Sequence, residues 1–331
     1  SESSFHDVAA RSSRGTESAR ALKIAILGYR SDPYSGGQGV YIYYLSKALI
    51  NAGHTVDVIS GPPYPILDSR VRLIKLPSLD LFENGLSSLR LRHLLSITDL
   101  IEWWSKLTGG FAEPYSFGRR AFSYLSRRRD YYDLVHDNQS LSFGMLKIQA
   151  LGIPLVTTIH HPITSDLRIA LSEASGWQDK FLIRRWHSFL KMQARVAHRL
   201  RHIVTVSECS RQDIAKDFSL SDKNIRVVYN GIDTKTFRPI PAIKRRTNLV
   251  MATASSDAPL KGVIYLLKAF ALLQEKYSDL ELTLVGKLRP GGAGEKMIQD
   301  LNLSTSVSIT SGISTVELVR MYAEATLVIV P

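Results

Sequence analysis

The chain has 331 residues, of which 44% are hydrophobic and 22% charged, a composition that predicts two folded domains and excludes a wholly disordered protein. No apolar run reaches the ~18 residues of a membrane-spanning helix, and the single cysteine, Cys209, excludes an internal disulfide and a cysteine-based zinc cluster. The net charge of +12 resides in residues 1–250, which carry 35 basic and 22 acidic side chains, and it favours anionic partners: nucleic acid, phosphorylated metabolites or a membrane surface.

The predicted elements alternate between strands and helices. Residues 1–20 are rich in Ser and Arg and predict a disordered leader without the apolar core of a secretory signal. A strand at 23–28, a helix at 40–52 and a strand at 55–60 then make a βαβ unit, which implies a parallel sheet.

Further alternation predicts that this first domain extends over residues 21–238. Between its later strands we expect a helix at 141–150 and one long basic amphipathic helix at 178–201. The later strands are expected at 133–136, 154–159, 202–207 and 225–229. Residues 239–247, which contain Pro and several basic residues, predict a linker.

A second domain is predicted over residues 248–331. Its expected strands are 248–253, 280–286, 307–310 and 327–330, and its expected helices are 262–276, 295–302 and 315–325. Three strand–helix pairs and a bare strand make an incomplete sheet, so we expect this domain to be partial. The predicted fold is α/β, with two Rossmann-like parallel-sheet domains.

Gly36 and Gly37 close the loop after the first strand, where a helix begins. Glycines allow close backbone approach, and a helix N-terminus attracts phosphate, so this loop is a candidate anion site as well as a simple tight turn. The sequence GGQG lacks the G-x-G-x-x-G spacing that is typical of dinucleotide cofactors.

Polar residues follow two predicted strands of the first domain. His160 and His161 follow one strand, at the edge where ligands bind in open parallel sheets, and they can contact a sugar hydroxyl or move a proton. Ser207 ends another strand, where it caps the next helix or lines the same edge. Cys209 has no neighbours that would activate a thiol, and we expect it to be inert.

The second domain offers cations next to helix starts. Lys261 precedes Gly262 and a predicted helix, where it is either a diphosphate ligand or a solvated lysine. A glycine-rich loop from Gly286 to Gly292 adds Lys287 and Arg289.

Four motifs, in this order and spacing, resemble the GT-B-fold glycosyltransferases of family 4, which are retaining nucleotide-sugar transferases. They are the first strand with Gly36–Gly37, the T-x-H of Thr158–His160, the V-x-N-G-x-D run of Val228–Asp233 with Phe237 and Pro239, and the Lys261–Gly262 pair. The resemblance covers residue 22 to the end. It implies two domains facing each other across a cleft, the first binding mainly the acceptor and the second the nucleotide sugar.

The resemblance also implies roles for individual residues. His160 is the expected catalytic residue, which contacts the donor sugar and supports an oxocarbenium-like transition state, while Lys261 neutralises the departing diphosphate. The implied donor-binding residues are Gly36, Gly37, Ser256, Lys261 and Gly286. His161 and Ser207 are expected to line the acceptor side. This chemistry requires neither a metal ion nor a cofactor.

The sequence departs from the family pattern in two places. The family has an Arg shortly before its Lys-Gly pair, whereas residues 253–257 contain none, so Ser255 or Ser256 supplies at most a hydrogen bond and Lys287 or Arg289 is expected to share the diphosphate charge. Family members also continue past a strand like 327–331 into a segment with two donor-contacting glutamates. We therefore expect a chain cut within the donor domain, with little activity by itself.

Residues 88–135 are rich in cations and aromatic side chains. Their combination suits an anionic membrane surface, and it equally suits a helical cap with a solvated Arg face. The residues expected at a membrane are Trp103, Trp104, Arg127, Arg128 and Arg129. The expected location is the cytoplasm, and peripheral attachment to the inner face of the membrane is compatible with it.

The leading hypothesis is thus a retaining glycosyltransferase that moves a sugar from a nucleotide sugar to a glycan or lipid-linked acceptor. The alternatives are a truncated, non-catalytic binding protein and a nucleotide-sugar epimerase. Nucleic acid is not an expected partner, because no recognition motif accompanies the basic charge.

Overall fold

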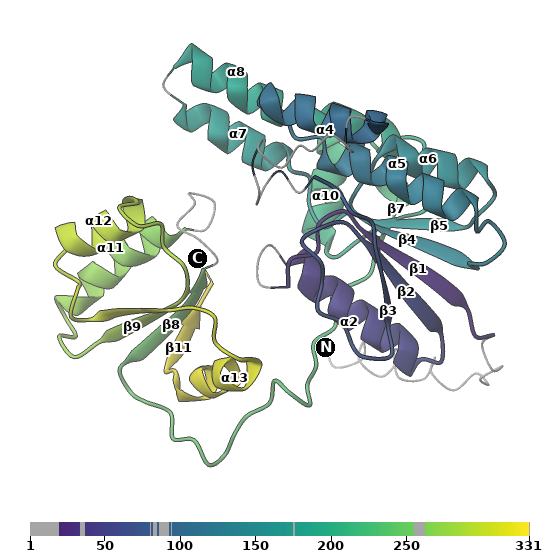
Figure 1. Ribbon diagram of the computed structural model, residues 1–331. Coiled ribbons are helices and arrows are strands. Elements are labelled where there is room, and N and C mark those ends of the chain that lie inside the picture. The colour runs from purple at the N-terminus through teal and green to yellow at the C-terminus, as the bar shows by residue number, and fades with distance from the viewer. Residues whose placement is uncertain are drawn as a thin grey trace.

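The computed structural model forms two parallel sheets joined by an extended segment at 228–248 (Figure 1). The residues that the structure describes are 20–33, 37–79, 81, 85, 93, 95–174, 176–254 and 262–330. The predicted leader lies, except for Arg20, outside the described residues.

The first sheet has seven parallel strands in the order β3-β2-β1-β4-β5-β6-β7. They are β1 (Lys23–Gly28), β2 (Thr55–Ser60), β3 (Arg72–Lys75), β4 (Leu134–Asn138), β5 (Leu155–Thr158), β6 (Ile203–Thr205) and β7 (Ile225–Val227). The strand order reverses between β1 and β4, because β2 and β3 extend one side of β1 and the later strands extend the other. In open parallel sheets, ligands bind at the carboxyl edge next to such a reversal.

Helices cover both faces of this sheet. Among the described residues, the helices of this domain are α2 (Gln38–Asn51), α4 (Ile97–Leu107), α5 (Glu113–Ser126), α6 (Phe143–Ala150), α7 (Thr164–Glu173), α8 (Trp177–Trp186), α9 (Phe189–Ala197) and α10 (Glu208–Asp217), with a 3₁₀ turn η5 (Asp222–Asn224). Of these, α7 and α8 extend beyond the sheet (Figure 1). Alternate residues of β1 face opposite layers, as the two-residue period of a strand requires. Ala25 and Leu27 pack in the core with α5, α6 and α9, whereas Ile24 and Ile26 pack with Ile42 of α2.

Helices α5 and α6 approach each other through Gly118 and Gly144. A Cβ atom on Gly144 would lie 2.1 Å from the carbonyl oxygen of Gly118, a distance at which one of the two backbones has to move. The close approach brings Phe117 and Met145, both buried, into one core. Glycine at both positions therefore holds α6, which follows β4 directly, against α5.

The second sheet has four parallel strands in the order β10-β9-β8-β11. Its elements are β8 (Leu249–Ala254), α11 (Val263–Gln274), β9 (Glu281–Gly286), α12 (Ala293–Asp300), β10 (Val307–Thr310), α13 (Thr315–Glu324) and β11 (Leu327–Ile329). Val250 and Ala252 of β8 pack in one core with Phe270 of α11 and Ile298 of α12. The parallel α/β architecture expected from the alternating sequence pattern is confirmed.

The expected single helix at 178–201 is wrong, because the chain turns at His187–Ser188 and forms two helices, α8 and α9. Around the turn the backbone hydrogen bonds join residues that are three positions apart. They run from Ser188 N to Arg185 O at 3.3 Å and from Leu190 N to His187 O at 3.0 Å. The break separates two environments: α8 has no fully buried residue, whereas α9 buries Leu190, among others, in the domain.

We predict that Gly144→Ala destabilises the protein by about 1–3 kcal/mol, the usual cost of overpacking a tight contact. The midpoint of urea unfolding measures the change. The matched control is Gly231→Ala, since nothing lies within 4 Å of a Cβ atom at Gly231. Equal stabilities of the two variants would contradict the proposed role of the α5–α6 contact.

Candidate functional site

The candidate site lies at the carboxyl ends of β4 and β5, on the β4 side of the strand reversal. His160 follows β5 by two residues, and the last residues of β4 are His136, Asp137 and Asn138. Tyr41 joins them from α2, the helix that begins after the glycine loop. The T-x-H motif is thus surrounded by β4 and α2 residues that the sequence analysis did not single out.

The ring of His160 is held by two neighbours. Its Nε2 lies 2.7 Å from Asn138 Oδ1, and the Tyr41 ring packs edge-on against it with the ring centroids 4.5 Å apart. Because an amide oxygen only accepts, Nε2 donates and Nδ1 remains as the acceptor. Burial, with a smaller contribution from His161, lowers the pKa of His160 to about 4, so the imidazole is neutral at pH 7.

A second histidine lies beside the first. His136 Nε2 is 2.8 Å from the Thr158 hydroxyl, which also lies 3.4 Å from the Tyr41 hydroxyl. Burial, and then the proximity of His160, lowers the pKa of His136 to about 4. The site therefore contains two neutral imidazoles, and burial also raises the pKa of Tyr41.

The loop after β4 is organised by the buried carboxylate of Asp137. It accepts hydrogen bonds from the Ser140 hydroxyl and from the backbone N–H groups of Ser140 and Leu141, at 2.5, 3.3 and 3.1 Å. Burial raises the pKa of Asp137 to about 6, although these hydrogen bonds act in the opposite direction. Within the loop, Gln139 and Leu141 have φ angles of 56° and 48°, a region that residues other than glycine seldom adopt.

Gln139 connects this loop to His160. Its side-chain oxygen accepts from His160 N–H at 2.7 Å, and its side-chain NH₂ donates to the carbonyl oxygen of His161 at 2.8 Å. The sequence analysis missed Gln139, because its partners are backbone atoms some 20 residues away. The one sequence signal was its place directly after a buried strand.

The glycine loop is described in part. Gly37 is the N-cap of α2 with a φ of 75°, a conformation that favours glycine, whereas Gly36 lies outside the described residues. Gly39 is also required, since its Cβ would lie 2.2 Å from the carbonyl oxygen of Asp32. The loop thus packs closely on the start of the helix that carries Tyr41.

The remaining predicted site residues are dispersed. Ser207 is the N-cap of α10 and accepts from Ser210 N–H at 3.0 Å, which confirms the capping prediction, and His161 is exposed. Gly286 ends β9 in the other sheet, while Ser256 and Lys261 lie outside the described residues. Among the described side chains, no group of three or more metal-binding residues gathers.

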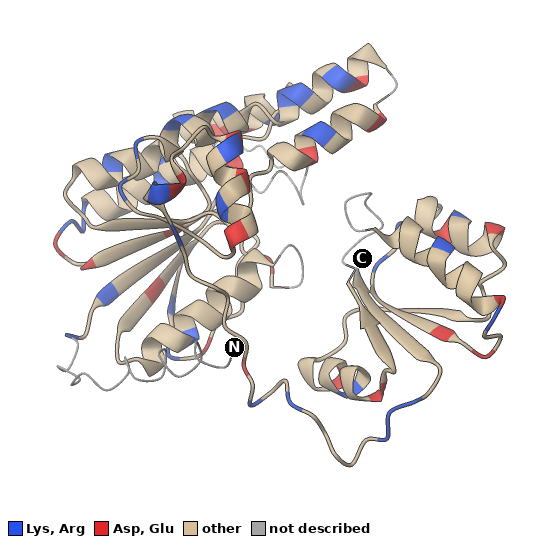
Figure 2. Cartoon of the chain, turned by 180° about the vertical axis from the view of Figure 1, so that it is seen from behind, with Lys and Arg blue, Asp and Glu red and all other residues tan. Residues whose placement is uncertain are grey.

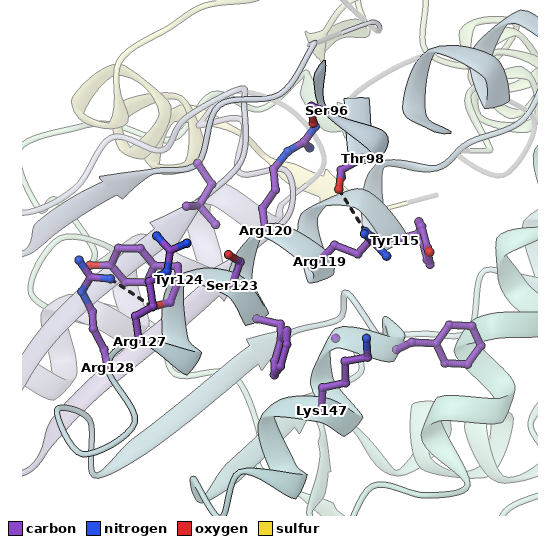
Figure 3. Close-up of a pocket in the computed structure, with 14 residues that line it drawn as sticks. Ser96, Thr98, Tyr115, Arg119, Arg120, Ser123, Tyr124, Arg127, Arg128 and Lys147 are labelled. Carbon is purple, nitrogen blue, oxygen red and sulfur yellow. Dashed lines mark hydrogen bonds between the residues drawn. The ribbon is translucent and has the colours of Figure 1, made fainter. Parts of the chain in front are cut away.

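A hollow of about 870 Å³ lies over α5 and α6 and shares no lining residue with the His160 cluster (Figure 3). Five of its lining residues are cations: Arg119, Arg120, Arg127, Arg128 and Lys147. The Arg128 guanidinium lies 3.9 Å from the centre of the Tyr124 ring. Figure 2 shows basic residues along the helices above this sheet. Within the described part of the chain, no helix is long and apolar enough to cross a membrane.

The sequence matches two glycosyltransferase families that divide it between them. Residues 35–236 match Glycosyltransferase Family 4, and residues 234–331 match Glycosyl transferases group 1.

Among curated proteins, an MMP alpha-(1->4)-mannosyltransferase of Mycolicibacterium hassiacum is 45% identical over 313 residues, covering 94% of this chain and 75% of that protein. A phosphatidyl-myo-inositol mannosyltransferase of Mycolicibacterium smegmatis is 24% identical over 262 residues, covering 77% of this chain and 57% of that protein. Among solved structures, sucrose-phosphate synthase from Thermosynechococcus elongatus superposes with a TM-score of 0.63 at 19% identity, over 94% of this chain and 75% of that one.

The lowered histidine pKa values predict a loss of stability on acidification. Between pH 6.5 and 4 the unfolded chain protonates His136 while the folded protein does not, so unfolding becomes easier as the pH falls. Asp137 has the opposite effect between pH 6 and 3.8, where it stabilises the folded protein as the pH falls. In this range the folded protein keeps a proton on Asp137 that the unfolded chain has lost. Because two histidines lower the free energy of unfolding and one aspartate raises it, we expect a net loss of stability between pH 7.5 and 5.5.

His136→Gln should reduce that loss by about 1 kcal/mol while keeping a polar partner for Thr158. Urea unfolding at the two pH values measures it, and His198→Gln, at an exposed histidine, is the control. An unchanged pH dependence in His136→Gln would show that His136 is protonated equally in both states.

Proposed function

Since the chain belongs to glycosyltransferase family 4 and has the GT-B fold, we propose that it transfers a mannosyl group from a nucleotide sugar to a glycan or lipid-linked acceptor, with retention of configuration. The observation that carries the proposal is the neutral His160, fixed at the carboxyl edge of β5 with Nδ1 left as an acceptor. The choice of mannose is supported by the two mannosyltransferases that the sequence resembles.

A neutral imidazole suits this reaction. As the bond between the sugar and the diphosphate breaks, positive charge develops on the sugar and negative charge on the leaving group. A protonated His160 would repel the sugar, whereas the neutral ring accepts a hydrogen bond from a sugar hydroxyl through Nδ1. Burial of the ring, the main cause of its low pKa, keeps it in this form.

The leaving diphosphate is the proposed ligand of residues from both domains. Gly36 and Gly37 would approach it with their backbone, and Lys261 would supply a charge next to the start of α11, with Ser256 and Gly286 adding polar contacts. Lys287 and Arg289 would share the negative charge. No metal ion is needed in this scheme, because cations and helix N-termini can stabilise a diphosphate.

The test is a transfer assay with GDP-mannose, UDP-glucose and UDP-N-acetylglucosamine as donors and methyl α-mannoside and α-1,4-mannobiose as acceptors. We expect transfer from GDP-mannose to be slow and to give an α-linked product, identified by NMR, and His160→Ala to lower kcat by a further factor of about 100. Lys261→Ala should weaken GDP binding by roughly 10- to 150-fold in calorimetry. Lys268→Ala, at an exposed lysine of α11, is the control.

A folded chain that transfers no sugar from these donors and binds none of their nucleotides would refute the proposal. Unchanged GDP affinity in Lys261→Ala would refute the placement of Lys261.

We further propose that the basic helical layer associates with an anionic membrane surface. Trp104 is 62% exposed on α4, and Arg127, Arg128 and Arg129 are exposed at the end of α5. Trp103, by contrast, is half-buried. An aromatic ring together with cations is the combination that suits lipid headgroups.

We predict that the protein co-sediments with vesicles containing phosphatidylserine more strongly than with phosphatidylcholine vesicles. The double variant Arg127→Ala/Arg129→Ala should reduce partitioning by tenfold or more, since each cation contributes about 1 kcal/mol. Lys244→Ala/Arg245→Ala, which removes two exposed linker cations, is the control of equal charge. Equal sedimentation with both vesicle types would contradict the membrane proposal.

A further inference from the structure

The side chain of Gln139 binds the backbone of both His160 and His161. Its one amide group accepts from the N–H of His160 at 2.7 Å and donates to the carbonyl oxygen of His161 at 2.8 Å. Gln139 is 2% exposed, and its φ of 56° is held by the loop that Asp137 closes. Such a backbone conformation persists where its surroundings impose it, and it is concentrated at functional sites.

Asn138, the preceding residue, holds the other end of His160. Its Oδ1 accepts from Nε2 of the ring, while its Nδ2 is fully buried and has no hydrogen-bond partner among the described residues. A buried NH₂ group without a partner is costly, so it indicates a ligand or a water molecule at this point. Asn138 thus keeps one unpaired donor inside the protein, and His160 keeps an acceptor at Nδ1 with which a sugar hydroxyl can pair.

We propose that Gln139 and Asn138 are positioning residues of the transfer reaction: Gln139 fixes the backbone of His160 and His161, and Asn138 fixes the ring so that Nδ1 accepts from a hydroxyl of the donor sugar. The assignment of this hydroxyl to a donor sugar rests on the proposed function. The positioning itself is a property of the folded chain and is tested without turnover.

The same chain contains a matched control. The side chain of Gln149 donates from Nε2 to Arg199 O and accepts at Oε1 from Arg201 N, both at 3.1 Å. This pair of bonds ties the end of α6 to the segment before β6, at the opposite edge of the sheet from His160. Gln149→Met and Gln139→Met therefore each remove two equivalent bonds, but only Gln139→Met removes them at the site.

The first experiment is ¹⁵N NMR of the histidine rings across a pH titration, with His160 assigned from the signals lost in His160→Gln. The titratable neighbours of the ring are Tyr41, His136 and His161. We expect Gln139→Met to reduce the Nε2–H tautomer of His160 and to raise its pKa by one unit or more. Gln149→Met should leave both as in the parent protein. An unchanged tautomer and titration in Gln139→Met would overturn the proposal.

The second experiment compares kinetics with GDP-mannose. Gln139→Met should lower kcat by tenfold or more with the donor KM changed by less than threefold, because a misplaced ring loses transition-state contacts first. Gln139→Glu keeps the acceptor for His160 N–H but loses the donor to His161, so it should show an intermediate kcat. It also replaces Gln139→Met in both experiments if that variant does not fold.

Gln149→Met should keep the parental kcat. A parental kcat in Gln139→Met and Gln139→Glu would overturn the positioning role. If the parent protein transfers no sugar and binds none of the nucleotides, the proposed function fails, and the NMR comparison still decides the positioning of His160.

Discussion

The arrangement around His160 depends on the hydrogen bonds that the buried carboxylate of Asp137 accepts from Ser140 and Leu141. They close the chain into a tight loop directly after β4 and hold Gln139 in a left-handed conformation. From that position Gln139 reaches the backbone after β5, and the adjacent Asn138 reaches the His160 ring. One carboxylate at the end of a central strand thus places side chains from two neighbouring strands.

The electrostatic character of the site follows from burial. The pKa values of His136 and His160 are both lowered to about 4, chiefly because the protein around them excludes water. The cations that line the hollow over α5 and α6 belong to a different place from this site. In the proposed reaction, a neutral acceptor next to the sugar avoids repulsion of the positive charge that develops there.

The sequence predicted the strands and helices best where apolar residues mark them clearly. The bounds of β1, β2 and β10 agree with their apolar runs, whereas the short edge strand β3 was missed because only its inner residues are even half-buried. The turn between α8 and α9 was missed because the amphipathic pattern runs through His187 without a break.

The candidate site was predictable to a smaller extent. His160 stood out through its motif and its place after a strand. The role of Gln139 arises from main-chain partners brought close by the parallel pairing of β4 with β5, which no local pattern encodes. Gly36, Ser256 and Lys261 lie outside the described residues, so their roles still depend on the family pattern.

The strand order has a consequence for synthesis of the protein on the ribosome. β1 pairs with β2 on one side and with β4 on the other, but about 60 residues separate the end of β3 from the start of β4. While those residues emerge, the nascent β1–β2–β3 sheet has an open apolar edge along Lys23–Gly28, and open edges invite pairing with other chains. Chaperone capture during translation is therefore most useful before β4 has left the exit tunnel.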